Sequence, residues 1–100
     1  MFERIKENED RLNNIIMCIK KLEDSINSFN DNLENIELVN KYYGSKNWFK
    51  DREKYEKMKI KNINAGVLSE DAIWNMNEEI KDLILDMEKI INLYEKKIFK

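Results

Sequence analysis

The chain has 100 residues, of which 42% are hydrophobic and 38% are charged, and its formal net charge is −2. This length is typical of a single domain, so we expect one domain over residues 1–100. The large apolar residues are too numerous and too regularly spaced for a disordered chain. The near-neutral balance excludes neither nucleic acid nor acidic partners, and it supports neither.

Proline is absent, and Gly44 and Gly66 are the only glycines. Because proline breaks helices and glycine weakens them, long stretches are free to be helical. The lone cysteine, Cys18, cannot form an internal disulfide, so no oxidising compartment is needed. The N-terminus lacks a hydrophobic signal core, and the longest apolar run, residues 15–19, is far too short to span a bilayer. We therefore expect a cytoplasmic protein with no membrane partner.

The first segment, from about Phe2 to Tyr43, carries apolar residues at heptad spacing. Its a and d positions, here called the seam, are Ile5, Asn8, Leu12, Ile15, Ile19, Leu22, Ile26, Phe29, Leu33, Ile36, Asn40 and Tyr43. The alternating spacing of three and four places these residues on one stripe of a helix roughly 60 Å long. A stripe this narrow is typical of a coiled-coil seam rather than of a helix sunk in a globule.

A tight corner is predicted directly after this helix. Gly44 tolerates the left-handed conformation that closes a helix, and Ser45 can cap a new one. We expect a short helix from about Lys46 to Lys59. Residues 61–68 are predicted to form a connection, because Gly66 lies within them and the helical pattern lapses.

The third segment opens at Ser69, a natural N-cap that is followed by the acidic Glu70 and Asp71. Its a and d positions are Ile73, Met76, Ile80, Leu83, Met87, Ile90 and Tyr94, and a further apolar row is Ile84, Ile91 and Ile98. Three apolar positions per heptad predict a helix that is buried more broadly than the first and that reaches nearly to Lys100.

These elements predict an all-α fold: a long antiparallel helical hairpin, coiled-coil-like, with a short middle helix across one end. The first helix is longer than the third by roughly ten residues, about 15 Å at the standard rise. Its N-terminal stretch around Ile5 and Leu12 would then lack a partner within the chain. We predict a homodimer through Ile5, Leu12, Ile15, Ile19 and Leu22.

The middle of the chain is basic, because residues 46–66 carry a net charge of +4 between two acidic arms. Its candidate binding residues are Trp48, Lys50, Arg52, Lys54 and Lys57. Aromatic side chains beside cations are how single-stranded nucleic acids are held. The acidic arms weaken the field, however, and the aromatics also suit a corner core. The pattern therefore favours a solvated helix with buried aromatics over nucleic-acid contact.

No catalytic chemistry is recognisable, and we expect neither enzyme activity nor a small-molecule substrate. Histidine is absent, which removes the most common general base and metal ligand. Glu79, Asp82 and Asp86 lie on one side of the third helix, where carboxylates could bind a divalent cation. A dedicated site would need ligands from a second helix, so a solvated flank is the favoured interpretation and no cofactor is expected.

Two short stretches have the character of fixed motifs. They are YYGSKNW, residues 42–48, and GVLSEDA, residues 66–72. Set between heptad helices, they resemble a bacterial family catalogued as domain of unknown function 4298. The resemblance implies a small helical bacterial protein and brings no established activity with it. Physically, both motifs are explained by the corner and by the start of the last helix.

Two functional hypotheses follow. The first is a non-enzymatic protein–protein interaction module that uses its long amphipathic helix to self-associate or to hold another protein. The alternative is a small inhibitory protein that blocks a nucleic-acid-handling partner. It could be phage-encoded, such as an anti-CRISPR, or an antitoxin-like binder. The small size of the chain and its basic middle between two acidic arms are compatible with the second hypothesis but do not require it.

Overall fold

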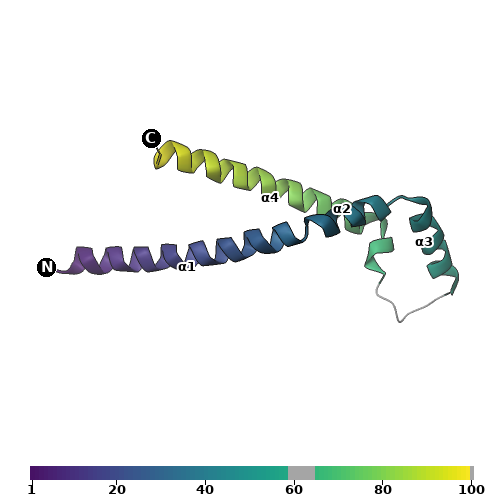
Figure 1. Ribbon diagram of the computed structural model, residues 1–100, viewed down its shortest axis with the longest axis horizontal. Helices are drawn as coiled ribbons and strands as arrows, with labels where there is room; N and C mark the ends of the chain where they lie inside the picture. The colour runs from purple at the N-terminus through teal and green to yellow at the C-terminus, as the bar shows by residue number, and fades with distance from the viewer. Residues whose placement is uncertain (59–64, 100) are drawn as a thin grey trace. The chain divides into compact units, whose positions relative to one another are not determined.

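The computed structural model describes residues 1–58 and 65–99 of the chain. They form five helical elements, which are α1 (Glu3–Asp31), α2 (Leu33–Tyr42), α3 (Lys46–Met58), the 3₁₀ turn η1 (Gly66–Leu68) and α4 (Glu70–Lys97) (Figure 1). None of the residues in the two described ranges is in a strand. The all-α prediction is therefore confirmed.

The chain divides into two compact units, Met1–Glu37 and Leu38–Lys100. The first contains α1 and the beginning of α2, and the second contains the end of α2 with α3, η1 and α4. The single domain expected over residues 1–100 stays a prediction.

The predicted first helix is interrupted once, at Asn32, which separates α1 from α2. The backbone N–H of Asn32 donates to the carbonyl of Phe29 at 3.0 Å, a tighter turn than the α-helical one. The side-chain amide of Asn32 donates to the carbonyl of Ser28 at 2.9 Å. Asparagine side chains compete in this way for helix backbone groups, and the helical path resumes because Ile36 N–H donates to the Asn32 carbonyl at 2.9 Å.

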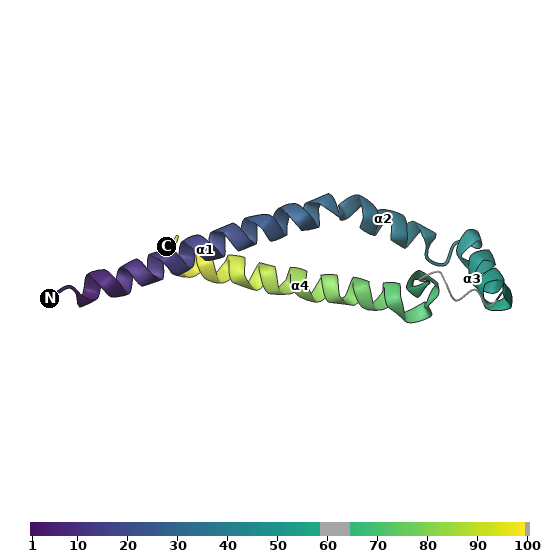
Figure 2. The ribbon, with the colours of Figure 1, turned by 90° about the horizontal axis from the view of Figure 1, so that it is seen from below.

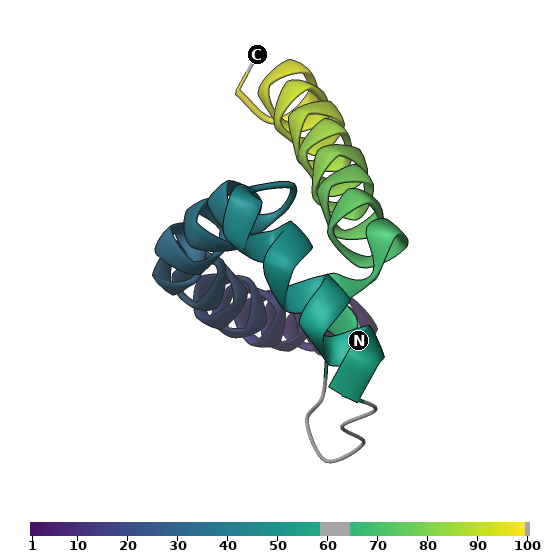
Figure 3. The same cartoon turned by 90° about the vertical axis from the view of Figure 1, so that its right-hand side faces the viewer.

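The corner between α2 and α3 forms as predicted. Gly44 has φ 76°, the left-handed conformation that a side chain disfavours. The Ser45 hydroxyl accepts a hydrogen bond from the backbone N–H of Trp48 at 3.2 Å and so caps α3. In Figure 3, α3 runs across the end of α2 and the beginning of α4.

The last helix also begins where predicted. The Ser69 hydroxyl accepts from the backbone N–H of Asp71 at 3.2 Å, and acidic residues occupy the first turn. The predicted connection before it is confirmed only in part, as the 3₁₀ turn η1 that precedes Ser69. The rest of the connection, with the predicted end of the middle helix, lies outside the described residues.

Within the second unit, the end of α2 lies against the first turns of α4. The side-chain amides of Asn40 and Asn77 exchange two hydrogen bonds, at 3.2 and 2.8 Å. The Tyr43 hydroxyl donates to the carbonyl of Glu70 at 2.8 Å. As residue numbers fall along α2, their partners' numbers rise along α4, so the two helix ends are antiparallel. The turn of the predicted hairpin is therefore present, and Figure 2 shows it in side view.

Candidate functional site

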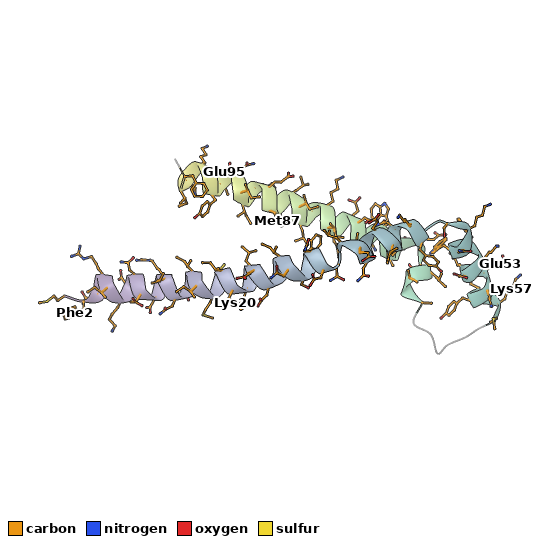
Figure 4. The ribbon with its side chains drawn as sticks, in the orientation of Figure 1. Phe2, Lys20, Glu53, Lys57, Met87 and Glu95 are labelled. Atoms are coloured by element: carbon orange, nitrogen blue, oxygen red, sulfur yellow. The ribbon has the colours of Figure 1, made fainter. Side chains whose placement is uncertain are left out.

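The predicted dimer residues all lie on α1. Their side chains, those of Ile5, Leu12, Ile15, Ile19 and Leu22, are 49–62% exposed. The first unit consists of little more than this one helix, and a single helix cannot bury its own apolar stripe. Burial of these residues therefore requires another helix. Side chains project from all around α1 in Figure 4, where Lys20 marks one of its polar positions.

The core of the second unit is built from the two sequence motifs, which meet at the corner. Trp48 is 3% exposed, and its indole N–H donates to the carbonyl of Val67 at 3.0 Å. The ring of Tyr43 meets that of Trp48 edge-on, with centroids 5.2 Å apart. With the bond from Tyr43 to Glu70, these contacts tie the first motif to the second. Ile73, at 5% exposed, is the other buried residue of this core.

Arg52 belongs to the same cluster and does not extend freely into solvent. Its guanidinium lies over the Trp48 ring, 5.3 Å from the centroid, and donates to the Glu70 carboxylate at 2.8 Å. The hydrogen bond to Glu70 raises the pKa of Arg52 above its ordinary value. A second carboxylate, that of Glu56, lies 3.5 Å away. Trp48 and Arg52, both predicted as binding residues, are thus engaged within the unit.

The remaining basic candidates lie on a different face of α3. Lys50, Lys54 and Lys57 are exposed, and their spacing of four and three places them along one side of the helix. Lys57 pairs with Glu53 at 2.8 Å, and both side chains are labelled on α3 in Figure 4. Their hydrogen bond lowers the pKa of Glu53 and raises that of Lys57.

The placement of the aromatic rings and the lysines on different faces of α3 bears directly on nucleic-acid binding. A single-strand site needs exposed rings beside its cations, whereas Trp48 is buried and Tyr55 is half-buried. On the described part of α3, Phe49 is the one exposed aromatic, at 58%, and it packs edge-on against Trp48 with centroids 4.9 Å apart. The structure separates most of the aromatic surface from the lysines that the sequence interleaves.

A further link joins α2 to α3. The Tyr42 hydroxyl donates to the Asp51 carboxylate at 2.7 Å. This hydrogen bond raises the pKa of Tyr42, because ionisation would set two negative charges side by side.

The last helix presents an apolar surface that the sequence interpretation treated as buried. Of its predicted core positions, Ile73 is buried, Met76 and Ile80 are half-buried, and every described residue from Lys81 onward is exposed. Within the second unit, the expected broad burial is found only in the first turns of α4, because only these turns have neighbours in that unit. The exposed positions are Leu83, Ile84, Met87, Ile90, Ile91 and Tyr94, here called the distal stripe; they are 41–64% exposed.

Sequence reasoning missed three participants at the corner: the Val67 carbonyl, the Glu70 carboxylate and the Asn77 amide. A buried indole N–H requires a hydrogen-bond acceptor, so the expected burial of Trp48 implied that an acceptor lies next to its indole nitrogen. No sequence feature identified Val67 as that acceptor. Trp74, 61% exposed on α4, was also overlooked, because it lies outside the heptad positions.

Within residues 1–58 and 65–99, no three Asp, Glu or Cys side chains are grouped closely enough to hold a metal ion. None of the described helices has the length and apolar character needed to cross a membrane.

Comparison with known proteins gives one finding about identity. Searches among curated proteins and among solved structures found no match. The model of a protein family, described as domain of unknown function DUF4298, matches residues 5–96, which is nearly the whole chain. The chain therefore belongs to the DUF4298 family.

Proposed function

We propose that the chain is a non-enzymatic protein–protein interaction module that self-associates through the N-terminal half of α1. The observation that supports this most directly is the exposed seam from Ile5 to Leu22. A contiguous apolar surface on a protein usually marks a contact site. A second copy is the simplest partner, because a two-fold axis lets one stripe bury an identical one.

Helix lengths support the proposal independently. α1 has 29 residues and α2 has ten, against 28 in α4. Whatever position α4 takes, roughly ten residues of the longer pair, about 15 Å, extend beyond what it could cover. If α1 continued along α4 in the antiparallel sense of the corner, this excess would fall at the N-terminal end, where Ile5 and Leu12 lie.

Sedimentation equilibrium of the full chain at tens of micromolar tests the proposal. We expect a dimer for the unmodified protein and a folded monomer for the double variant Leu12→Glu with Ile19→Glu. Asn13→Glu with Asn27→Glu is the matched control, because it adds the same two charges outside the seam. A monomeric unmodified protein, or a control that dissociates as readily as the seam variant, would contradict the proposal.

A further inference from the structure

The exposed side of α3 is a second interaction surface, separate from the seam of α1. Four lysines form it, here called the lysine stripe: Lys46, Lys50, Lys54 and Lys57. We infer that the lysine stripe binds an acidic helical segment of another protein. None of its four residues belongs to the surface used in the proposed function, so this inference does not depend on self-association.

The lysine stripe faces solvent. Spacings of four, four and three residues keep it within about a quarter of the circumference of the helix. It lies across α3 from Trp48 and Tyr55, which are buried and half-buried. All four lysines are exposed, and in Figure 4 the labelled Lys57 is on the side of α3 that is turned away from η1. The packed side and the charged side of α3 are therefore distinct, and the charged side is open to a partner.

The acidic residues of α3 already have partners, whereas most of the stripe does not. The three carboxylates are those of Asp51, which accepts from Tyr42, Glu53, which pairs with Lys57, and Glu56, which pairs with Arg52. The side chains of Lys46, Lys50 and Lys54 form no hydrogen bond or ion pair with any residue in the ranges 1–58 and 65–99. Three positive charges along one side of the helix thus lack a counter-charge among the described residues.

Charge complementarity selects an anionic partner, and the surrounding charges select a narrow one. Residues 67–100 of the same unit include eight acidic and five basic residues, and Glu70 and Asp71 occupy the first turn of α4. A broad anionic surface, such as a nucleic-acid duplex or a membrane, would bring its charges against these carboxylates as well. A single acidic helix meets α3 alone. Its carboxylates at positions i and i+4 share the rise of the lysines, so the two rows align along the stripe.

Exposed apolar side chains border the stripe on both sides. Phe49, three residues after Lys46, is 58% exposed, and Met58, four residues after Lys54, is 54% exposed. Exposed ion pairs contribute little to affinity individually, so a stable contact needs apolar area beside the charges. Aromatic residues and methionine are enriched in protein interfaces for this reason. We therefore expect the partner helix to carry apolar residues next to its carboxylates.

Fluorescence anisotropy with a labelled peptide tests the inference on the full chain. The probe is a helical peptide of about 20 residues with glutamates at i and i+4 spacing and leucines beside them. Its companion carries glutamine in place of every glutamate. We expect the protein to bind the glutamate probe and not its companion. The affinity should fall roughly tenfold between about 50 and 500 mM salt, because the ion pairs are screened.

Removing the unpartnered charges should weaken this binding. The triple variant Lys46→Gln, Lys50→Gln and Lys54→Gln should lose roughly tenfold in affinity for the glutamate probe. The matched control removes three charges from exposed positions on α4 and should stay within about twofold of the unmodified protein; it carries Lys81→Gln, Lys89→Gln and Lys96→Gln. Circular dichroism of both variants verifies that they are folded.

Charge reversal provides a test that a merely weakened protein would fail. Lys50→Glu with Lys54→Glu should reject the glutamate probe and should bind the same peptide with lysine at its charged positions. A reversed variant that binds neither peptide while remaining folded would contradict the inference.

Three further outcomes would overturn it. The first is no binding of the glutamate probe, or an equal loss in the α4 control. The second is tighter binding of a DNA duplex or of vesicles of phosphatidylglycerol and phosphatidylcholine, since the stripe would then serve a phosphate surface. The third is a sedimentation equilibrium in which the triple lysine variant alone loses the dimer, which would identify a second copy of this chain as the occupant.

Discussion

Trp48 and Val67 are 19 residues apart in the sequence and are joined by a hydrogen bond of 3.0 Å from the indole N–H to the carbonyl. That bond connects α3 to η1 and so brings the start of α4 to the corner where α2 ends. The edge-on contact of Tyr43 with Trp48 and the bond from Tyr43 to Glu70 add two further links across the same corner.

Trp48→Phe should destabilise the protein by about 1–3 kcal/mol, because the Val67 carbonyl loses its hydrogen-bond partner at a partly buried site. Urea denaturation followed by far-ultraviolet circular dichroism measures the change. Trp74→Phe is the matched control, since Trp74 is exposed and its replacement should shift the stability by less than about 0.5 kcal/mol. Equal effects at the two positions would show that the indole bond contributes nothing measurable.

Gly44→Ala should cost about 1 kcal/mol. No atom lies within 4 Å of the position that the new Cβ would take, so the cost comes from the backbone, which is held at φ 76°. Gly44→Asn should cost less, because asparagine adopts this conformation more readily. Thermal unfolding of the three proteins gives the order; an alanine variant as stable as the asparagine variant contradicts the positive φ.

The bond between Tyr42 and Asp51 predicts a dependence of stability on alkaline pH. The pKa of Tyr42 is raised above its ordinary value of 10.0 by the hydrogen bond to Asp51, so the folded state favours the neutral phenol. Its contribution is fully present below the unfolded pKa and is lost as pH rises through the folded pKa. Tyr42→Phe should remove this contribution.

Denaturant unfolding between pH 8 and pH 11 measures this effect. The stability difference between the unmodified protein and Tyr42→Phe should be constant at the lower end and should shrink toward the upper end. Tyr94→Phe, on the exposed part of α4, serves as the control and should follow the unmodified protein throughout. A difference that does not change with pH would contradict an ionisable contribution.

Arg52 and Lys50 occupy different sides of α3, and their replacement should have different consequences. Arg52→Gln removes both the contact over Trp48 and the ion pair with Glu70, so the melting temperature should fall. Lys50→Gln removes one charge from the same helix at an exposed position and should leave it unchanged. Arg52→Lys should restore little, because lysine cannot reproduce a planar group that stacks and donates together.

Whether a structural feature could be predicted from the sequence depends on how far apart in the chain its interacting residues lie. Caps and corners were predictable at Gly44, Ser45 and Ser69, because each depends on its own conformation or on a backbone group within a few residues. The all-α class followed from heptad spacing, which is also local. The interruption at Asn32 was not foreseen, since asparagine is tolerated within helices and nothing distinguished this one from its neighbours.

The candidate site was less predictable, because its contacts are long-range. The sequence interleaves Trp48 and Arg52 with lysines, and only the fold shows that the first two turn toward Val67 and Glu70. The exposed distal stripe on α4 was missed for a related reason. Heptad spacing identifies an apolar face, but it does not say which surface covers that face.

Thermal unfolding should depend on protein concentration, and this dependence tests self-association without a hydrodynamic measurement. If folding is linked to dimerisation, a tenfold rise in concentration stabilises the folded state by about 1.4 kcal/mol, which raises the melting temperature by several degrees for a chain of this size. The variant Leu12→Glu with Ile19→Glu should melt at a temperature that is independent of concentration. The control Asn13→Glu with Asn27→Glu should keep the dependence, because its charges lie away from the seam. An unmodified protein whose melting temperature stays constant between about 2 and 200 micromolar would show that folding does not require a second copy.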